Sequence, residues 1–244
     1  MLLYLTLLLT ASASAIPLAS RAQPVTPNPT FSEETFQKLL DAPTAADRFT
    51  LIQSMGVPTK FDFNPDANPN GGVGSGPGGI GILANQKTFL PLIGLGVAMS
   101  AGFLNPCGMN VPHTHSRATE FLTIVEGGNV TTGFYMENDG PPAFNNTLNK
   151  YQGAILPMGS FHFEFNDNCE PAVFIAAFSH EDPGLSNIGA NLFKLRPDVV
   201  AAILDYPTAV DASNINKLKH TLPPEFIDNV ASCLNRCGIK PSSS

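Results

Sequence analysis

The chain has little charge, and its few basic residues do not gather into a patch. Charged residues make up 14% of its 244 positions, against about 25% in an average globular protein. The formal net charge at pH 7 is -7. Nucleic acids and anionic membranes attract proteins through clusters of Lys and Arg, which are missing here. The sequence therefore argues against both as partners.

Long apolar runs are missing after the first residues. The stretch "LLYLTLLLTA", residues 2–11, is followed by small residues, with Ala13 and Ala15 at the spacing that a signal peptidase requires. The run is shorter than the about 20 apolar residues of a membrane-spanning helix, and no second run follows. We predict a signal peptide over residues 1–15 and a secreted, extracellular protein.

A glycine-rich stretch lacks the context of a nucleotide site. "GGVGSGPGGIG", residues 71–81, contains Gly74, Gly76 and Gly79 at the GxGxxG spacing. No strand pattern precedes the motif and no helix start follows, so the strand–helix–strand unit that binds dinucleotides is not indicated. A flexible loop that leads into a strand is the preferred interpretation. No internal repeat of solenoid period is present either.

What the sequence does contain is a series of short strand-like segments. From about residue 88 to 195, runs such as "EFLTIVEG", "VTTGFYM" and "AVFIAAFS" alternate with turns such as "ENDGPP" and "NDNCEP". The low charge, 21 Gly and 22 Pro also favour a turn-rich β protein. This pattern is typical of an antiparallel sandwich or barrel, so we predict a mainly β fold.

Helical patterns flank the β region on both sides. Ser32 can cap a first helix with Phe31 and Phe36 as a hydrophobic staple, and Thr44 with Asp47 resembles a capping box. After residue 196, "PDVVAAILDY" and "PPEFIDNVASCLNRCG" each show a period near 3.6. We therefore expect four segments: a signal peptide over 1–15, a Pro-rich leader and helical arm over 16–70, a barrel over 71–195, and C-terminal helices and tail over 196–244.

Four cysteines agree with a secreted chain. Of the three possible connectivities, local pairing of Cys107 with Cys169 and of Cys233 with Cys237 is the one we predict; free buried thiols are the alternative. The sequons at Asn129 and Asn145 predict N-glycosylation.

Three histidines and a glutamate form a candidate metal site. His113 and His115 are two residues apart, which places both side chains on one face of a strand. Glu120 begins the next strand-like run, and His162 lies in a later one. Imidazole and carboxylate ligands suit Mn, Fe, Co, Ni, Cu or Zn, and octahedral geometry would leave two positions open. The alternative is that the HxH pair lies on the surface or only packs.

Two stretches resemble the motifs of a known family. "NPCGMNVPHTHSRATEFLTIVEG", residues 105–127, is similar to the first cupin motif, and "LPMGSFHFEFN", residues 156–166, is similar to the second. "PHTHSRATE" most resembles germins, germin-like proteins and spherulins, of a fungal or protist branch. The departures are Cys107 and Tyr151, which replace motif glycines. The resemblance implies a jelly-roll β-barrel and a homo-oligomer built through terminal helices. It also implies Mn2+ bound by His113, His115, Glu120 and His162.

The resemblance also implies two activities that act on small anions. Germin-like proteins include manganese superoxide dismutases and oxalate oxidases. Asn110 matches an asparagine that orients oxalate, although it could instead be a turn residue, and a second such asparagine is replaced by Ser100. Superoxide dismutase is therefore placed ahead of oxalate oxidase. Sugar isomerisation or dioxygenation is a weaker possibility.

The main alternative is a non-catalytic protein of the cell wall, spore or extracellular matrix, whose metal stabilises the barrel. A pocket open to small anions would favour the enzyme, and a metal enclosed by side chains would favour the structural protein.

Overall fold

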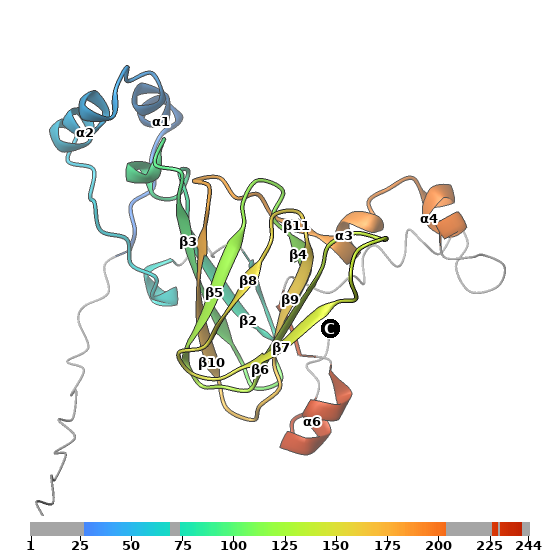
Figure 1. Ribbon diagram of the computed structural model, residues 1–244. Coiled ribbons are helices and arrows are strands. Elements are labelled where there is room, and N and C mark those ends of the chain that lie inside the picture. Colours follow the sequence, from blue (N-terminus) through green and yellow to red (C-terminus); the bar gives the residue numbers. More distant parts are fainter. Residues whose placement is uncertain (1–26, 69–73, 204–225, 229, 241–244) are drawn as a thin grey trace, which may run out of the picture.

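A computed structural model describes residues 27–68, 74–203, 226–228 and 230–240 of the chain (Figure 1). The expected signal peptide lies outside these residues. Strands dominate the described part, and they form two antiparallel sheets that pack face to face. The expectation of a mainly β jelly-roll fold with helices at both ends is confirmed.

Each of the two sheets has six strands. The first sheet has the order β1 (Gly74–Gly76), β2 (Gly79–Ala84), β3 (Ala98–Leu104), β10 (Ala172–Phe178), β5 (Glu120–Glu126) and β8 (Gly153–Leu156). The second has the order β11 (Ser186–Asn187), β4 (Met109–Thr114), β9 (Phe161–Asn166), β6 (Val130–Tyr135) and β7 (Phe144–Leu148), with β12 (Phe226–Ile227) also paired to β4.

The core lies between the sheets and follows the two-residue period of the strands. In β5, Leu122 and Ile124 are fully buried while Phe121 is 52% exposed on the outer face. In β10, Ala172, Phe174, Ala176 and Phe178 point inward. The inner faces therefore supply one continuous apolar core.

Two helices precede the sheets and have a small core of their own. The helix α1 (Glu33–Leu40) begins at Ser32, whose hydroxyl accepts from Thr35 N at 3.2 Å. The helix α2 (Ala45–Ser54) begins at Thr44, which accepts from Asp47 N at 3.1 Å. Both predicted caps are present. The helices pack with the short 3-10 turn η2 (Leu90–Leu92), while a second such turn, η1 (Pro65–Ala67), lies between the helical arm and β1. The buried residues of this arm are Leu39, Ile52, Val57, Leu90 and Ile93.

The C-terminal part is helical but differs from the expectation in one place. It contains α3 (Ile188–Leu192), α4 (Pro197–Ile203) and α6 (Ala231–Cys237), which ends at Gly238 with φ 63°. The second predicted helix should already include Phe226, yet Phe226 and Ile227 form strand β12 against β4. Phe226 is 3% exposed inside the core, so burial and strand pairing override the helical period here. Among the described helices, none is long and apolar enough to cross a membrane.

The glycine-rich stretch is a hairpin from Gly74 onward, and the prediction of a flexible loop is wrong there. The strands β1 and β2 pair through a turn at Pro77 and Gly78. Gly79 has φ 148°, and a Cβ atom at this position would lie 2.1 Å from the carbonyl oxygen of Phe103. Only glycine permits this approach of β2 to β3. Residues 69–73 lie outside the described part.

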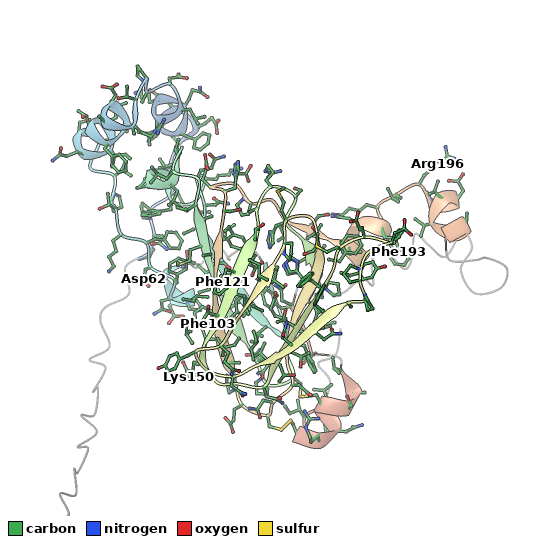
Figure 2. The ribbon with its side chains drawn as sticks, viewed as in Figure 1. Asp62, Phe103, Phe121, Lys150, Phe193 and Arg196 are labelled. Atoms are coloured by element: carbon green, nitrogen blue, oxygen red, sulfur yellow. A yellow bond between two sulfur atoms is a disulfide. The ribbon has the colours of Figure 1, made fainter. Side chains whose placement is uncertain are left out.

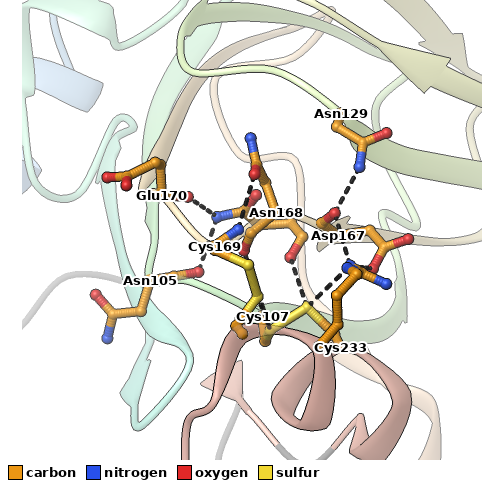
Figure 3. Close-up of a disulfide and its surroundings, with 11 residues drawn as sticks. Asn105, Cys107, Asn129, Asp167, Asn168, Cys169, Glu170 and Cys233 are labelled. Carbon is orange, nitrogen blue, oxygen red and sulfur yellow. Dashed lines mark hydrogen bonds and ion pairs between the residues drawn. A yellow bond between two sulfur atoms is a disulfide. The ribbon is translucent and has the colours of Figure 1, made fainter.

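The cysteines pair across the molecule, and the predicted local pairing is wrong. The bridges are Cys107–Cys233, whose two residues are labelled in Figure 3, and Cys169–Cys237. Cys233 and Cys237 are one helical turn apart on α6, so their side chains leave the same face of the helix. Each reaches a different loop, one after β3 and one after β9. The two disulfides therefore fasten α6 to one end of the two sheets.

Candidate metal centre and its cavity

The structure brings together the four residues that the sequence singled out as metal ligands. His113 lies on β4, His115 just after it, and His162 on the neighbouring strand β9, while Glu120 begins β5 of the other sheet. All four are buried, and one ligand atom from each lies within 4.8 Å of the others. These residues, called the quartet below, span the space between the sheets.

Backbone carbonyls fix the orientation of the three imidazoles. A carbonyl oxygen only accepts hydrogen bonds, so each Nδ1 atom must carry the proton and donate it. The Nε2 atoms are then bare acceptors, as metal ligation requires. The bonds join His113 to Val111 O at 2.8 Å, His115 to Gly184 O at 2.5 Å and His162 to Ser160 O at 3.0 Å.

The centre of the quartet holds acceptors without donors. Glu120 Oε2 lies 3.1 Å from His115 Nε2 and 3.3 Å from His162 Nε2. Neither Glu120 Oε2 nor His162 Nε2 has a hydrogen-bond partner. Lone pairs that face each other in a buried site are unfavourable unless a cation lies between them. The residues present therefore fit a divalent metal, and nitrogen with carboxylate ligands suits a transition metal.

The surroundings of His113 and Glu120 keep both side chains in the form that binds metals. The pKa of His113 is lowered to about 3, first by burial and then by neighbouring His162 and His115. For Glu120, burial acts to raise the pKa, but the contacts to His115 and His162 outweigh it and lower the pKa to about 2. Metal ligands must be deprotonated, and both side chains meet that condition at neutral pH.

A second buried carboxyl lies beside the quartet. Glu164 is fully buried on β9, and its Oε2 accepts a hydrogen bond from Asn110 Nδ2 at 2.8 Å. Its Oε1 has no partner. Burial and then the charge of Glu120 raise the pKa of Glu164 well above its ordinary value, against the hydrogen bond from Asn110. Glu164 was not among the predicted site residues, although the two-residue period of the strand places it on the same face as His162.

A cavity of about 350 Å³ reaches the quartet. His113, His115 and Glu120 line it, and so do Asn110 and Ser100, the two positions that the resemblance related to substrate. Its lining also includes Arg117 and Asp182, an ion pair at 2.9 Å. These two side chains are 47% and 42% exposed. The cavity therefore extends from the solvent to the quartet.

Residues 64–216 match the model of the family described as Cupin. The chain is a cupin. Spherulin-1A of Physarum polycephalum is 36% identical to it over 213 residues, which cover 87% of this chain and 82% of that protein. Spherulin-1B of the same organism is 34% identical over 225 residues, with 92% and 87% covered. The resemblance to spherulins and germin-like proteins is thus confirmed.

Plant relatives and solved structures match shorter parts of this cupin. Germin-like protein 8-9 of Oryza sativa subsp. japonica is 37% identical over 138 residues, or 56% of this chain and 61% of that protein. A recombinant oxalate oxidase in complex with glycolate superposes with a TM-score of 0.53 at 25% identity. That match covers 60% of this chain and 74% of the oxidase.

Proposed function

We propose that this cupin binds a divalent metal through the quartet, with manganese as the first candidate, and acts as an oxidoreductase on a small anion. The observation that carries the proposal is the cavity, which connects solvent to His113, His115 and Glu120. A metal that served only to stabilise the two sheets would need no such access. The non-catalytic alternative is therefore placed second.

The metal, when bound, supplies a redox couple and coordination positions that the protein does not fill. The chain's own residues do the rest. Asn110 lines the cavity beside His113, and its amide can hold an anion in one orientation. Glu164 holds that amide in place by accepting a hydrogen bond from Asn110 Nδ2. Arg117 places a cation at the exposed end of the cavity, although Asp182 balances much of its charge.

Superoxide and oxalate are the two substrates that we propose to test, in that order. Dismutation requires only a redox metal, access and a source of protons. Oxalate is supported by the likeness to an oxalate oxidase, but Ser100 offers a hydroxyl where an orienting amide was expected. Secretion and a homo-oligomeric state belong to the same proposal. The two disulfides support the first, because such bridges persist in oxidising compartments.

The first experiment is metal analysis of the secreted, untagged protein by mass spectrometry. His113→Ala removes one ligand of the quartet, and His180→Ala is a control because His180 is only partly buried and lies outside the quartet. We expect about one manganese per chain in the wild type and in His180→Ala, and none in His113→Ala. Superoxide and oxalate assays follow on the loaded protein. Absence of metal from all three proteins, after growth with manganese, would overturn the proposal.

A further inference from the structure

The cavity is polar at one end and apolar at the other. His113, His115, Glu120 and Asn110 line the polar end, and the ring of Phe178 lies beside His115. Leu83, Phe174 and Phe226 are large apolar side chains of the remaining wall, which Asn85, Ser100, Arg117 and Asp182 also line. The three phenylalanines are at most 5% exposed, so they belong to the packed interior and not to a surface patch. A substrate that is polar throughout gains nothing from such a wall.

Two glycines mark the far end of the cavity. Gly81 and Gly102 are paired across β2 and β3. A Cβ atom on Gly102 would lie 2.1 Å from Cζ of Phe174, and one on Gly81 would lie 3.2 Å from Cζ of Phe226. The two rings thus occupy the space above the glycine pair and close the cavity there.

The cavity is longer than a two-carbon substrate needs. Its near end is marked by Phe178, whose ring centroid lies 4.8 Å from that of His115. Phe174 is four residues earlier on β10, which corresponds to roughly 13 Å along a strand. The volume of about 350 Å³ is also far above the roughly 30 Å³ that one water occupies in the liquid. Superoxide or oxalate would leave the apolar end unfilled.

We propose that the cavity binds a carboxylate that carries an apolar substituent. The carboxylate lies toward the quartet and Asn110, and the substituent lies against Phe174 and Phe226. This inference rests on the metal-dependent function proposed above and names the substrate class of the same site. Each methylene buried at the apolar end should raise the affinity about fourfold.

Phe226 sets the length of the substituent in this arrangement. It belongs to β12, in the C-terminal segment, and pairs directly with Asn110 on β4. The residue that contacts the carboxylate, Asn110, and the residue that limits the length of the substituent, Phe226, are therefore paired on neighbouring strands. Phe226 is held in place from both sides, because Gly78 N donates to its carbonyl oxygen at 3.4 Å and the disulfides fasten the following helix α6.

The test uses the full chain loaded with manganese and titrated calorimetrically with acetate, butyrate, hexanoate and octanoate, with glycolate and oxalate in parallel. We expect affinity to rise about 16-fold from acetate to butyrate and then to stop rising when the acid reaches Phe226. Phe226→Ala should move that limit to a longer acid, and Phe226→Trp should move it to a shorter one. Phe226→Leu serves as the milder variant if Phe226→Ala does not fold.

The control is Phe121→Ala, which removes an equal ring from the outer face of β5 (Figure 2). Its affinity profile should equal that of the wild type. Affinity that is flat or falls with chain length, in protein that holds manganese and binds glycolate, overturns the inference and leaves the metal-dependent function intact. An unchanged length limit in the folded Phe226 variants overturns the role of Phe226. Failure of the wild type to take up any metal overturns the proposed function itself.

Discussion

In the metal-free protein, Glu164 and His113 make the free energy of unfolding depend on pH in opposite directions. The pKa of His113 is lowered to about 3. Between pH 6.5 and 3, His113 is therefore protonated in the unfolded chain but not in the folded chain. Stability from this residue is lost as the pH falls. The pKa of Glu164 is raised by burial, so above pH 4.5 the unfolded chain releases a proton that the folded chain keeps. Stability is then lost as the pH rises.

These two effects predict opposite slopes in two variants of the metal-free protein. Between pH 4.5 and 6.5, Glu164→Gln should lose stability as the pH falls, by up to about 1.4 kcal/mol per pH unit. His113→Gln should gain stability over the same range. The wild type should lie between them, because its two contributions oppose each other. Urea unfolding at several pH values in the presence of a chelator measures all three.

Two residues outside the core provide the matched controls for that comparison. Glu126→Gln and His180→Gln make the same substitutions outside the core and are measured in parallel. Equal slopes in Glu164→Gln and His113→Gln would contradict the assignment of these pKa shifts to burial.

The quartet was predictable from the sequence, whereas Glu164 was not. The spacing of His113 and His115 places both on one strand face, and the family motifs supply Glu120 and His162. Glu164 alternates with phenylalanines, which places it on the same strand face as His162, but a glutamate is rarely buried and is therefore normally assigned to solvent. Its partner Asn110 is 54 residues away, so only the folded chain shows that the carboxyl is buried and hydrogen-bonded.

At the scale of helices and strands, the position of α6 depends on contacts between residues that are distant in sequence. Caps at Ser32 and Thr44 predicted α1 and α2 because a cap is a local interaction. The strand β12 and the disulfides involve residues more than 60 positions apart, and no local pattern specifies them. The helical period of the C-terminal segment was correct for α6 and wrong for Phe226, whose burial in the core decides its conformation.

The disulfides should contribute strongly to stability. Cys107–Cys233 closes 126 residues of chain, for which the chain-entropy model gives about 5 kcal/mol. The double variant Cys107→Ser with Cys233→Ser should lose roughly 2–5 kcal/mol in urea unfolding without reductant. Cys169→Ser with Cys237→Ser should lose a similar amount, because its loop of 68 residues differs little on a logarithmic scale.

Peptide mapping of the unreduced protein checks the pairing directly. A peptide that joins Cys107 to Cys233 is expected, together with one that joins Cys169 to Cys237. A peptide that joins Cys107 to Cys169 would contradict the structure, whatever the stability of the variants.

At the scale of the whole molecule, the quartet connects the two sheets. His113 and His162 come from one sheet and Glu120 from the other. A metal bound by the quartet would therefore link the two sheets, and it would stabilise the folded state by mass action. At a metal concentration 100 times the dissociation constant this amounts to about 2.7 kcal/mol.

Removal of the metal should lower the melting temperature by roughly 5–10 °C in a chain of this size. Differential scanning calorimetry of the loaded protein with and without chelator measures the difference. His113→Ala should melt at one temperature under both conditions. An identical melting temperature of the wild type before and after chelation would show that the quartet does not hold a metal that connects the sheets.

The disulfide arrangement also has a consequence for biosynthesis. Cys107 and Cys169 leave the ribosome long before their partners, and their loops are neighbours, because Cys107 N donates to Asn168 O at 3.1 Å. The first bridge available to the growing chain is therefore the one between these two residues, which the finished protein does not contain. Cys107 Sγ lies only 3.7 Å from Cys237 Sγ, so the four sulfurs form one cluster in which thiolates can exchange. Formation of the two final bridges from that first one therefore requires thiol–disulfide exchange after Cys233 and Cys237 have been synthesised.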